Sequence, residues 1–373
     1  MTVAVEQLRD AAAGEALESF LEGRESPLVS GTRATFFWRG EADEVRLRHW
    51  IFGLPSAATM ERLPDSDVWF VTLEIPAESR VEYKIELVEG AHRRLICDPL
   101  NPNRASDPFG QNSVFYGLGY ERPEWTLEHP ETRPGTLEEV TVRSRAFGES
   151  RDVLVYLPAR FRRHRTYPLL IAHDGRDYLR FSGLKTVLDN LIERHEIAPM
   201  VVALTTSSDR LVEYGADPRH ARFLARDLMP ALERNFPLSP LRGLMGASFG
   251  GVASLYTAWR YPRLFRRLLL QSGSFAFSDI GHHNRSPAFD PVAEFVNAFR
   301  AAPGKPAEKI FLSCGMYESL IYENRSMIPL LQEAGLEIRY REARDGHNWE
   351  NWRDRLREAL SWLFPGPLWM VYE

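Results

Sequence analysis

A short glycine-rich turn constrains the fold of this chain more than any other part of the sequence. Residues 246–250 read Gly-Ala-Ser-Phe-Gly, which fits the pattern G-x-S-x-G. The turn follows a predicted strand at 242–245 and precedes a helical stripe made by Val252, Leu255, Tyr256 and Trp259. A nucleophile elbow requires this strand–turn–helix setting, because small flanking residues let a sharp turn expose the serine hydroxyl. In the alternative interpretation, the two glycines only permit the helix to pack closely on the strand.

The second half of the sequence alternates between short apolar runs and amphipathic helical patterns. Continuous apolar runs are typical of parallel strands whose two faces are both covered by helices. The clearest helical stripes are Leu184, Val187, Leu188, Leu191 and Ile192, and Phe223, Leu224, Leu228, Met229 and Leu232. The pattern predicts a doubly wound α/β domain, with strands at 153–157, 169–172, 200–205, 242–245, 268–271, 310–313 and 338–341.

The first third of the sequence has a different rhythm. After a weak helical stripe at Val5, Leu8, Leu17 and Phe20, residues 32–116 contain short runs of branched and aromatic residues separated by turn signals. The clearest runs are 34–38, 44–49, 68–75 and 81–87. Their spacing predicts a β-sandwich of immunoglobulin-like size. Residues 120–135 carry Pro123, Pro130 and Pro134 and read as a linker, so we expect an N-terminal domain at 1–130 and an α/β domain at 131–373.

Composition excludes several classes of protein. The chain has 373 residues, a net charge of −5, 44% hydrophobic and 26% charged residues, which is ordinary for a folded globular protein and leaves no basic excess for nucleic acid. No apolar run approaches a membrane span, and Glu6, Arg9 and Asp10 interrupt any signal-peptide core, which predicts a soluble protein that is not exported by the usual route. Cys97 and Cys314 support neither a disulfide framework nor a zinc site, and no motif indicates a metal or cofactor.

A serine nucleophile needs a base and an acid. His347 lies 99 residues after Ser248, in a loop between the run 338–341 and a final amphipathic helix. In the α/β-hydrolase order of serine, acid and histidine, the base lies after the last strand. Glu318 is the first carboxylate after the run 310–313, and an acid there would hold the imidazole in its useful tautomer. Glu323 and Asp345 are competing candidates for the acid.

Two backbone N–H groups are expected to form an oxyanion hole. The N–H of Phe249 follows the nucleophile at a helix N-terminus, whose partial positive charge favours an oxyanion. The turn His173-Asp174-Gly175-Arg176 follows the run 169–172, and the Arg176 N–H is the candidate second donor. A simple turn is the alternative interpretation.

Four segments together resemble the enterochelin esterase family, which belongs to a wider esterase group that includes feruloyl esterases, S-formylglutathione hydrolases and mycolyltransferases. They are residues 246–251, the Asp174-Gly175 turn, residues 209–214 and the sequence Gly346-His347-Asn348-Trp349. The resemblance extends to the N-terminal part, at residues 36–39, 67–69, 83–85 and 98–102. It therefore covers about residues 32–364.

The resemblance implies a serine esterase that hydrolyses the trilactone of a catecholate siderophore in the cytoplasm and so releases iron. It implies Ser248 as nucleophile, His347 as base, Glu318 as acid, Phe249 and Arg176 as oxyanion donors, and Arg210, Asp174 and Trp349 at the substrate. The family's loop more often reads Gly-Gly-His-Asp-Trp, so Asp345 and Asn348 are departures.

Other interpretations remain open. The runner-up is a feruloyl or acetyl ester linked to carbohydrate, with Trp38 or Trp69 of the N-terminal domain as a glycan-stacking platform or as core residues. A non-catalytic binding protein on the same scaffold is the third. We expect a small-molecule partner rather than a nucleic acid or a membrane, and a homo-oligomer is left open.

Overall fold

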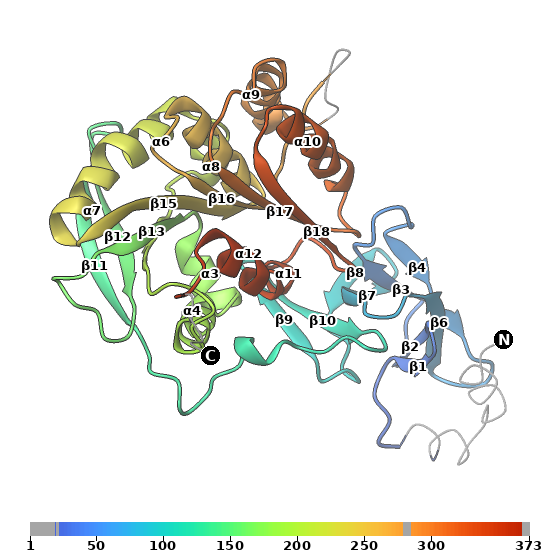
Figure 1. Cartoon of the computed structure of the whole chain (residues 1–373). Helices are drawn as coiled ribbons and strands as arrows, with labels where there is room; N and C mark the ends of the chain where they lie inside the picture. Colours follow the sequence, from blue (N-terminus) through green and yellow to red (C-terminus); the bar gives the residue numbers. More distant parts are fainter. Residues whose placement is uncertain (1–18, 20–21, 279–284, 368–373) are drawn as a thin grey trace. The chain divides into compact units, whose positions relative to one another are not determined.

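The computed structural model describes residue 19 and residues 22–278 and 285–367, and its contacts divide the chain into two compact units (Figure 1). The first comprises the described residues up to Arg122 together with Gly315–Ser319 and Ala343–Asn348. The second comprises Pro123–Cys314, Leu320–Glu342 and the described residues from Trp349 onward. The predicted helical stripe near the N-terminus lies outside the described residues.

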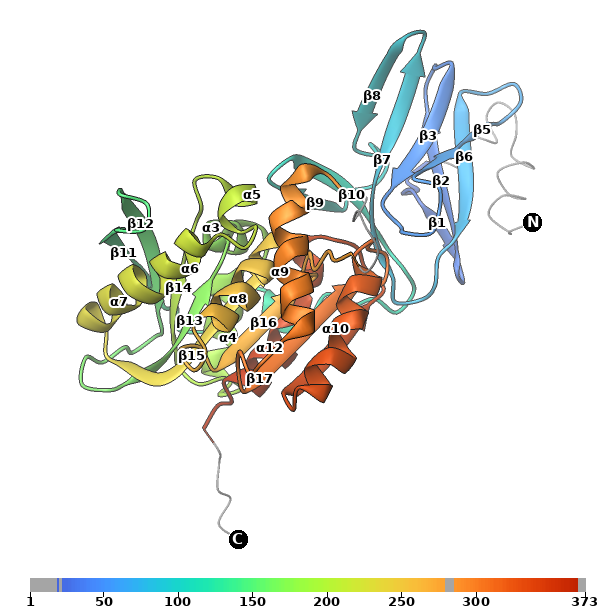
Figure 2. The same ribbon diagram turned by 90° about the horizontal axis from the view of Figure 1, so that it is seen from above.

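The first unit is built from two antiparallel sheets (Figure 2). One has the order β1-β2-β6-β5, formed by Leu28–Ser30, Arg33–Arg39, Val68–Glu74 and Glu61–Arg62. The other has the order β4-β3-β7-β10-β9, formed by Ala57–Thr59, Glu44–His49, Arg80–Glu89, Gly110–Tyr116 and Arg104–Asp107. A further strand, β8 (His92–Ile96), pairs with β7.

The two sheets share one core, because alternate residues of each strand point to the same face. Phe36 of β2 packs edge-on against Tyr83 of β7, with ring centroids 4.8 Å apart. Trp38 and Trp69 belong to the same core and are each 7% exposed. Neither tryptophan can therefore serve as the exposed glycan-stacking platform of the runner-up interpretation.

The second unit contains an eight-stranded sheet with the order β11-β12-β14-β13-β15-β16-β17-β18. Strands β13 to β17 pair in parallel, whereas β11 and β12 are joined antiparallel at one edge. The prediction of an α/β sheet is confirmed, and β11 is a strand that the polar sequence did not indicate. The strands of this sheet are β11 (Thr136–Arg143), β12 (Ser150–Leu157), β13 (Tyr167–Ala172), β14 (Val201–Leu204), β15 (Leu238–Ala247), β16 (Arg267–Gln271), β17 (Lys309–Gly315) and β18 (Glu337–Ala343).

Helices cover both faces of this sheet (Figure 1). Leu169 and Ile171 of β13 belong to the core under one helical layer, and their neighbours Leu170 and Ala172 belong to the core under the other. One layer holds α6 (Pro218–Arg222), a π-helical turn (Phe223–Leu228), α7 (Met229–Asn235), α8 (Phe249–Arg260), α9 (Asp290–Ala301) and α10 (Ile321–Glu333). The other holds α3 (Gly175–Phe181), α4 (Leu184–Glu193), α11 (Trp349–Asp354) and α12 (Leu356–Leu363).

Short elements complete the chain: the 3-10 turns Glu124–Thr126 and Pro287–Phe289, and α5 (Arg210–Glu213). Within the part of the chain that the structure describes, no helix is both long and apolar enough to cross a bilayer. The described residues also contain no group of three or more His, Cys, Asp or Glu side chains arranged to hold a metal ion.

Candidate active site

Ser248 occupies a strained turn between β15 and α8. Its backbone has φ 56° and ψ −121°, which a residue with a side chain rarely adopts. A Cβ on Gly246 would lie 2.4 Å from the backbone of Gly250, so only glycine fits there. The turn therefore has the tight geometry that the sequence predicted, and it places Ser248, half-buried, at the end of a parallel strand.

The loop after β16 supports the serine. The Ser248 N–H donates to the carbonyl of Gln271 at 2.9 Å, and the Ser274 N–H donates to the Ser248 carbonyl at 3.2 Å. The Ser248 and Ser274 hydroxyl oxygens are 3.1 Å apart. Sequence reasoning missed Ser274, and only its position just after a parallel strand could have indicated it.

The candidate oxyanion loop follows β13. Asp174 has a left-handed backbone with φ 51°, and the Gly175 N–H donates to the Thr205 carbonyl at 2.8 Å. A Cβ on Gly175 would lie 2.5 Å from Leu204, which explains the glycine. Arg176 is the second residue of α3, in the first turn, where helical N–H groups point outward without intrahelical acceptors.

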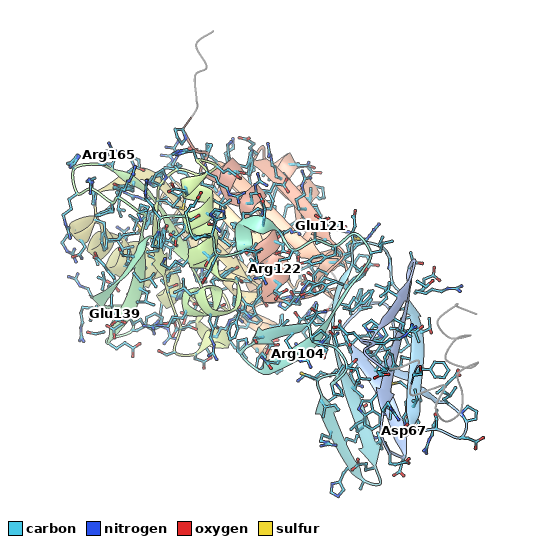
Figure 3. The ribbon with its side chains drawn as sticks, turned by 90° about the horizontal axis from the view of Figure 1, so that it is seen from below. Asp67, Arg104, Glu121, Arg122, Glu139 and Arg165 are labelled. Carbon is cyan, nitrogen blue, oxygen red and sulfur yellow. The ribbon has the colours of Figure 1, made fainter. Side chains whose placement is uncertain are left out.

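An arginine joins this loop to the elbow. Arg210 donates to the Asp174 carboxylate at 2.9 Å through Nε and to the Ala247 carbonyl at 3.3 Å. Asp174 is 7% exposed, so the pair is largely shielded from water on the carboxylate side. The guanidinium of Arg176 instead pairs at 3.0 Å with Glu139 of β11, which is labelled in Figure 3, and both side chains are exposed. Each arginine predicted near the site is therefore already paired with a carboxylate.

Two buried histidines lie beneath the loop. His173 Nε2 is 3.1 Å from His220 Nε2, and His173 Nδ1 is 3.0 Å from the Met245 carbonyl. Burial lowers the pKa of His173 to about 3, so its ring is neutral. A neutral ring that donates from Nδ1 to Met245 must accept at Nε2. His173 is thus a structural residue.

Glu318 and His347 form a hydrogen-bonded pair. Glu318 Oε2 lies 2.6 Å from His347 Nδ1, and Glu318 Oε1 accepts the Gly315 N–H at 2.6 Å. The Glu318 side chain is 1% exposed, whereas the His347 side chain is 38% exposed. The bond assigns the ring proton to Nδ1, which makes Nε2 the basic nitrogen.

The competing acids are engaged elsewhere. Glu323 lies in α10 and forms an ion pair with Arg285. Asp345 accepts hydrogen bonds from Arg80, Asn348 and the Gly346 N–H, and burial raises its pKa to about 7. Of the three candidates, Glu318 is the one with a carboxylate oxygen at His347 Nδ1.

Trp349, which was predicted to contact substrate, is buried among aromatic side chains. It begins α11, is 8% exposed and packs edge-on against Tyr178 and Trp352, with centroids 5.2 and 4.8 Å away. Its indole fills the core between α3 and α11. The aromatic residue after His347 therefore anchors the last helices to the sheet.

The structure thus assembles two groups. In the second unit, Arg210 hydrogen-bonds both Asp174 and the Ala247 carbonyl, and so joins the turn before Arg176 to the elbow that carries Ser248 and Phe249. A Cβ on Gly250 would lie 3.2 Å from His173, which brings the same two segments together. In the first unit, Glu318 and His347 are hydrogen-bonded. An activated serine requires both groups.

Family models match most of the chain. A model described as "Putative esterase" matches residues 144–363, and a model described as "Enterochelin esterase, N-terminal" matches residues 33–119. The first covers more than half of the sequence and contains all the candidate catalytic residues.

Individual relatives match over nearly the whole length. The chain is 25% identical over 369 residues to the iron(III) enterobactin esterase of Escherichia coli O6:H1, and the match covers 87% of this chain and 90% of the relative. The fold matches the ferric enterobactin esterase of Salmonella typhimurium with a TM-score of 0.76 and 21% identity, over 93% of this chain and 98% of that one. The enterobactin esterase of Shigella flexneri, solved in the presence of enterobactin, matches with a TM-score of 0.75 and 22% identity, over 93% of this chain and 97% of that one.

Proposed function

Because the chain belongs to the esterase family whose model spans residues 144–363, we propose that it is a serine esterase acting on the trilactone of a catecholate siderophore. The observation that carries the chemistry is the 2.6 Å bond between Glu318 and His347, which prepares a base for the serine of the strained elbow. Ester hydrolysis of this kind needs a nucleophile, a base, an orienting acid and two N–H donors. The chain supplies a candidate for each.

In the proposed reaction, Ser248 Oγ attacks the ester carbonyl while His347 Nε2 takes its proton. The N–H groups of Phe249 and Arg176 stabilise the negative oxygen of the tetrahedral intermediate. His347 then gives the proton to the leaving alkoxide, and the acyl group stays on Ser248. A water molecule, deprotonated by His347, attacks the acyl-enzyme and releases the acid and the serine. Glu318 stabilises the imidazolium in both halves.

The proposed substrate is supported by the length over which this chain is similar to its relatives. The N-terminal model matches a segment outside the hydrolase domain, and the full-length relatives carry the name enterobactin esterase. Hydrolysis of all three ester bonds of a ferric trilactone would leave separate chelating fragments that hold iron less tightly, because one hexadentate ligand becomes three smaller ones. We propose that this releases iron in the cytoplasm.

Charge recognition of such a substrate needs more than the predicted arginines. A ferric catecholate trilactone is a polyanion, and the chain's net charge of −5 does not attract it over long range. Arg210 and Arg176 are each paired with a carboxylate. We propose that substrate contact by Arg210 or Asp174 involves rearrangement of their pair.

The domain organisation is part of this proposal. We propose that the two-sheet unit is an immunoglobulin-like sandwich and that residues 1–130 and 131–373 are the two domains, with two loops of the second contributing to the compact core of the first. The oligomeric state is left open. The runner-up substrate, a carbohydrate-linked ester, has less support because Trp38 and Trp69 are buried.

A substrate panel tests the proposal. Purified protein is given an enterobactin-type trilactone, a feruloylated sugar and a short p-nitrophenyl ester, with Ser248→Ala and His347→Ala as controls. We expect the highest kcat/KM on the trilactone and loss of about 10³-fold or more in both variants. A fluorophosphonate should label wild-type Ser248 and spare Ser248→Ala. Preference for the feruloylated sugar would favour the runner-up, and absence of labelling and turnover would favour a binding protein.

A further inference from the structure

A buried arginine of strand β7 contacts the loop that carries His347. Arg80 is 0% exposed, which is unusual for a residue that always carries a charge. Its Nη1 donates to Asn348 Oδ1 at 2.9 Å and to Asp345 Oδ1 at 3.3 Å, and its Nη2 donates to Glu82 at 2.8 Å. The guanidinium therefore binds residues on both sides of His347.

Backbone contacts reinforce the same attachment. The Arg80 N–H donates to the Arg344 carbonyl at 2.9 Å, and the Arg344 side chain donates to the Ala77 carbonyl at 2.8 Å. All these groups belong to the first compact unit, although residues 77–82 and 344–348 are more than 260 positions apart in sequence. The loop is thus held along its length by the start of β7.

The loop also closes on itself around Asp345. Oδ1 of Asp345 accepts the Gly346 N–H and the Asn348 side-chain amide, each at 2.7 Å, and the Asp345 carbonyl accepts the Tyr317 N–H at 3.1 Å. Tyr317 precedes Glu318, and its hydroxyl lies 2.6 Å from that of Ser79. The acid and base loops are therefore tied to one another and to Ser79-Arg80.

Stability alone does not explain such an arrangement. Desolvation of a buried ion pair often costs as much as the pair gains, and well-packed apolar residues commonly replace such pairs without loss. A fully hydrogen-bonded buried network does restrict the geometry of the groups it joins. The planar fork of arginine can bind two acceptors in fixed directions, which lysine cannot.

We propose that Arg80 is a positioning residue for the base: by holding Asp345 and Asn348, it fixes His347 against Glu318. This rests on the proposed function, and it assigns the N-terminal β unit a part in the chemistry of the hydrolase domain. A displacement of about 1 Å in a catalytic group can cost about 10²-fold in rate. Loss of Arg80 should thus lower kcat and leave substrate binding nearly unchanged.

The test compares full-length wild type with Arg80→Met, Arg80→Lys and Arg39→Met. Arg39 is the matched control, since it pairs at 3.0 Å in the same unit with Asp67, which is labelled in Figure 3, and the two side chains are 32% and 37% exposed. In Arg80→Met we expect kcat to fall about 10- to 100-fold with KM within about twofold. Arg80→Lys should recover part of the loss, and Arg39→Met should match wild type. Hydrogen exchange should accelerate in peptides spanning 343–349 and stay unchanged around Ser248.

Defined outcomes would overturn the proposal. They are a folded Arg80→Met with wild-type kcat, an equal loss in Arg39→Met, or a raised KM at unchanged kcat. If Arg80→Met fails to fold, Asn348→Ala is used instead, because it removes one hydrogen-bond acceptor of Arg80 and leaves no buried charge without a partner. An unchanged kcat in both Asn348→Ala and Arg80→Lys would then overturn the proposal. Failure of the proposed function would show differently, as a wild type without Ser248-dependent turnover.

Discussion

The nucleophile and the base are held in place by different physical means. Ser248 is fixed by its own backbone, through glycines within two positions and a left-handed φ of 56°. His347 is fixed by side chains from far along the sequence, namely Glu318, 29 positions away, and the loop contacts of Arg80, about 265 positions away. Steric exclusion governs the first arrangement, and long-range hydrogen bonds govern the second.

This difference predicts different responses to mutation. A backbone-built turn has no alternative geometry, so adding a single methyl group should destroy it. A side-chain network loses one bond at a time, so its variants should lose activity in steps and remain folded. Substitutions in each of the two regions test this contrast.

Gly246→Ala should have the largest effect. Its Cβ would lie 2.4 Å from the Gly250 backbone, which cannot yield without moving the elbow. We expect a loss of at least about 10³-fold in kcat/KM, or a protein that does not fold. Activity toward a p-nitrophenyl ester and near-ultraviolet circular dichroism measure the two outcomes.

Gly304→Ala is the matched control. Gly304, unlike Gly246, has a positive φ of 58°, and nothing lies within 4 Å of the position that an alanine Cβ would take there, so it tests backbone strain without a steric clash. The substitution should cost only about 1–2 kcal/mol of stability from backbone strain. Gly246→Ala activity within tenfold of wild type would contradict the steric account of the elbow.

Glu318→Gln should have the next largest effect. The amide keeps the size of the carboxylate but cannot stabilise an imidazolium, and it can present an N–H to Nδ1 and so favour the wrong tautomer. We expect kcat to fall about 10³- to 10⁴-fold with little change in KM or thermal stability. Steady-state kinetics and a melting curve test this.

Glu323→Gln serves as the comparison, because Glu323 pairs with Arg285 and was a competing acid in the sequence. Its kcat should stay within about twofold of wild type. A reversed order of the two variants would assign the acid to Glu323.

The same contrast explains how much the sequence could predict. The elbow could be predicted from the sequence because its requirements are local: small residues, a strand before and a helix after, all within about 20 positions. The α/β alternation could be predicted for a similar reason, since strands that are buried on both faces of the sheet have continuous apolar runs. Strand β11 was missed because it is an edge strand whose residues are mostly exposed and include three charged side chains, so no apolar run marks it.

The contacts around the base, His347, could not be predicted from the sequence. Nothing in the sequence near Arg80 indicates that its side chain meets Asp345 and Asn348, because that contact depends on how distant segments pack. Asp345 could be read only as a competing acid, and Trp349 only as an aromatic residue beside a histidine. Burial decides both roles, and single-residue patterns do not report burial in a loop.

Asp345→Asn should sharpen the contrast through pH. Burial raises the pKa of Asp345 from 3.8 to about 7. Between these values the folded state holds a proton that the unfolded state has lost, so stability falls as pH rises through this window. The loss in the free energy of unfolding is complete above about pH 7 and is on the order of 4 kcal/mol.

Asparagine has no such proton, so the free energy of unfolding of Asp345→Asn should vary less between pH 4 and 8. Urea unfolding at several pH values measures this, with Asp67→Asn as a surface control. We expect the variant to be relatively more stable than wild type at pH 8 and yet less active. Identical pH dependence in wild type and Asp345→Asn would refute the account of this buried carboxyl group.

Arg210→Met should have the smallest effect, and it separates two roles for one residue. If Arg210 holds the oxyanion loop to the elbow through Asp174 and Ala247, its loss should lower kcat about tenfold with KM nearly constant. If Arg210 instead binds the anionic substrate, KM should rise for the ferric trilactone and stay constant for a neutral p-nitrophenyl ester. Arg176→Met retains its backbone N–H and loses only an exposed pair with Glu139, so it should stay within about twofold of wild type on both substrates. A tenfold loss in Arg176→Met would show that its side chain, and not only its backbone, takes part in the reaction.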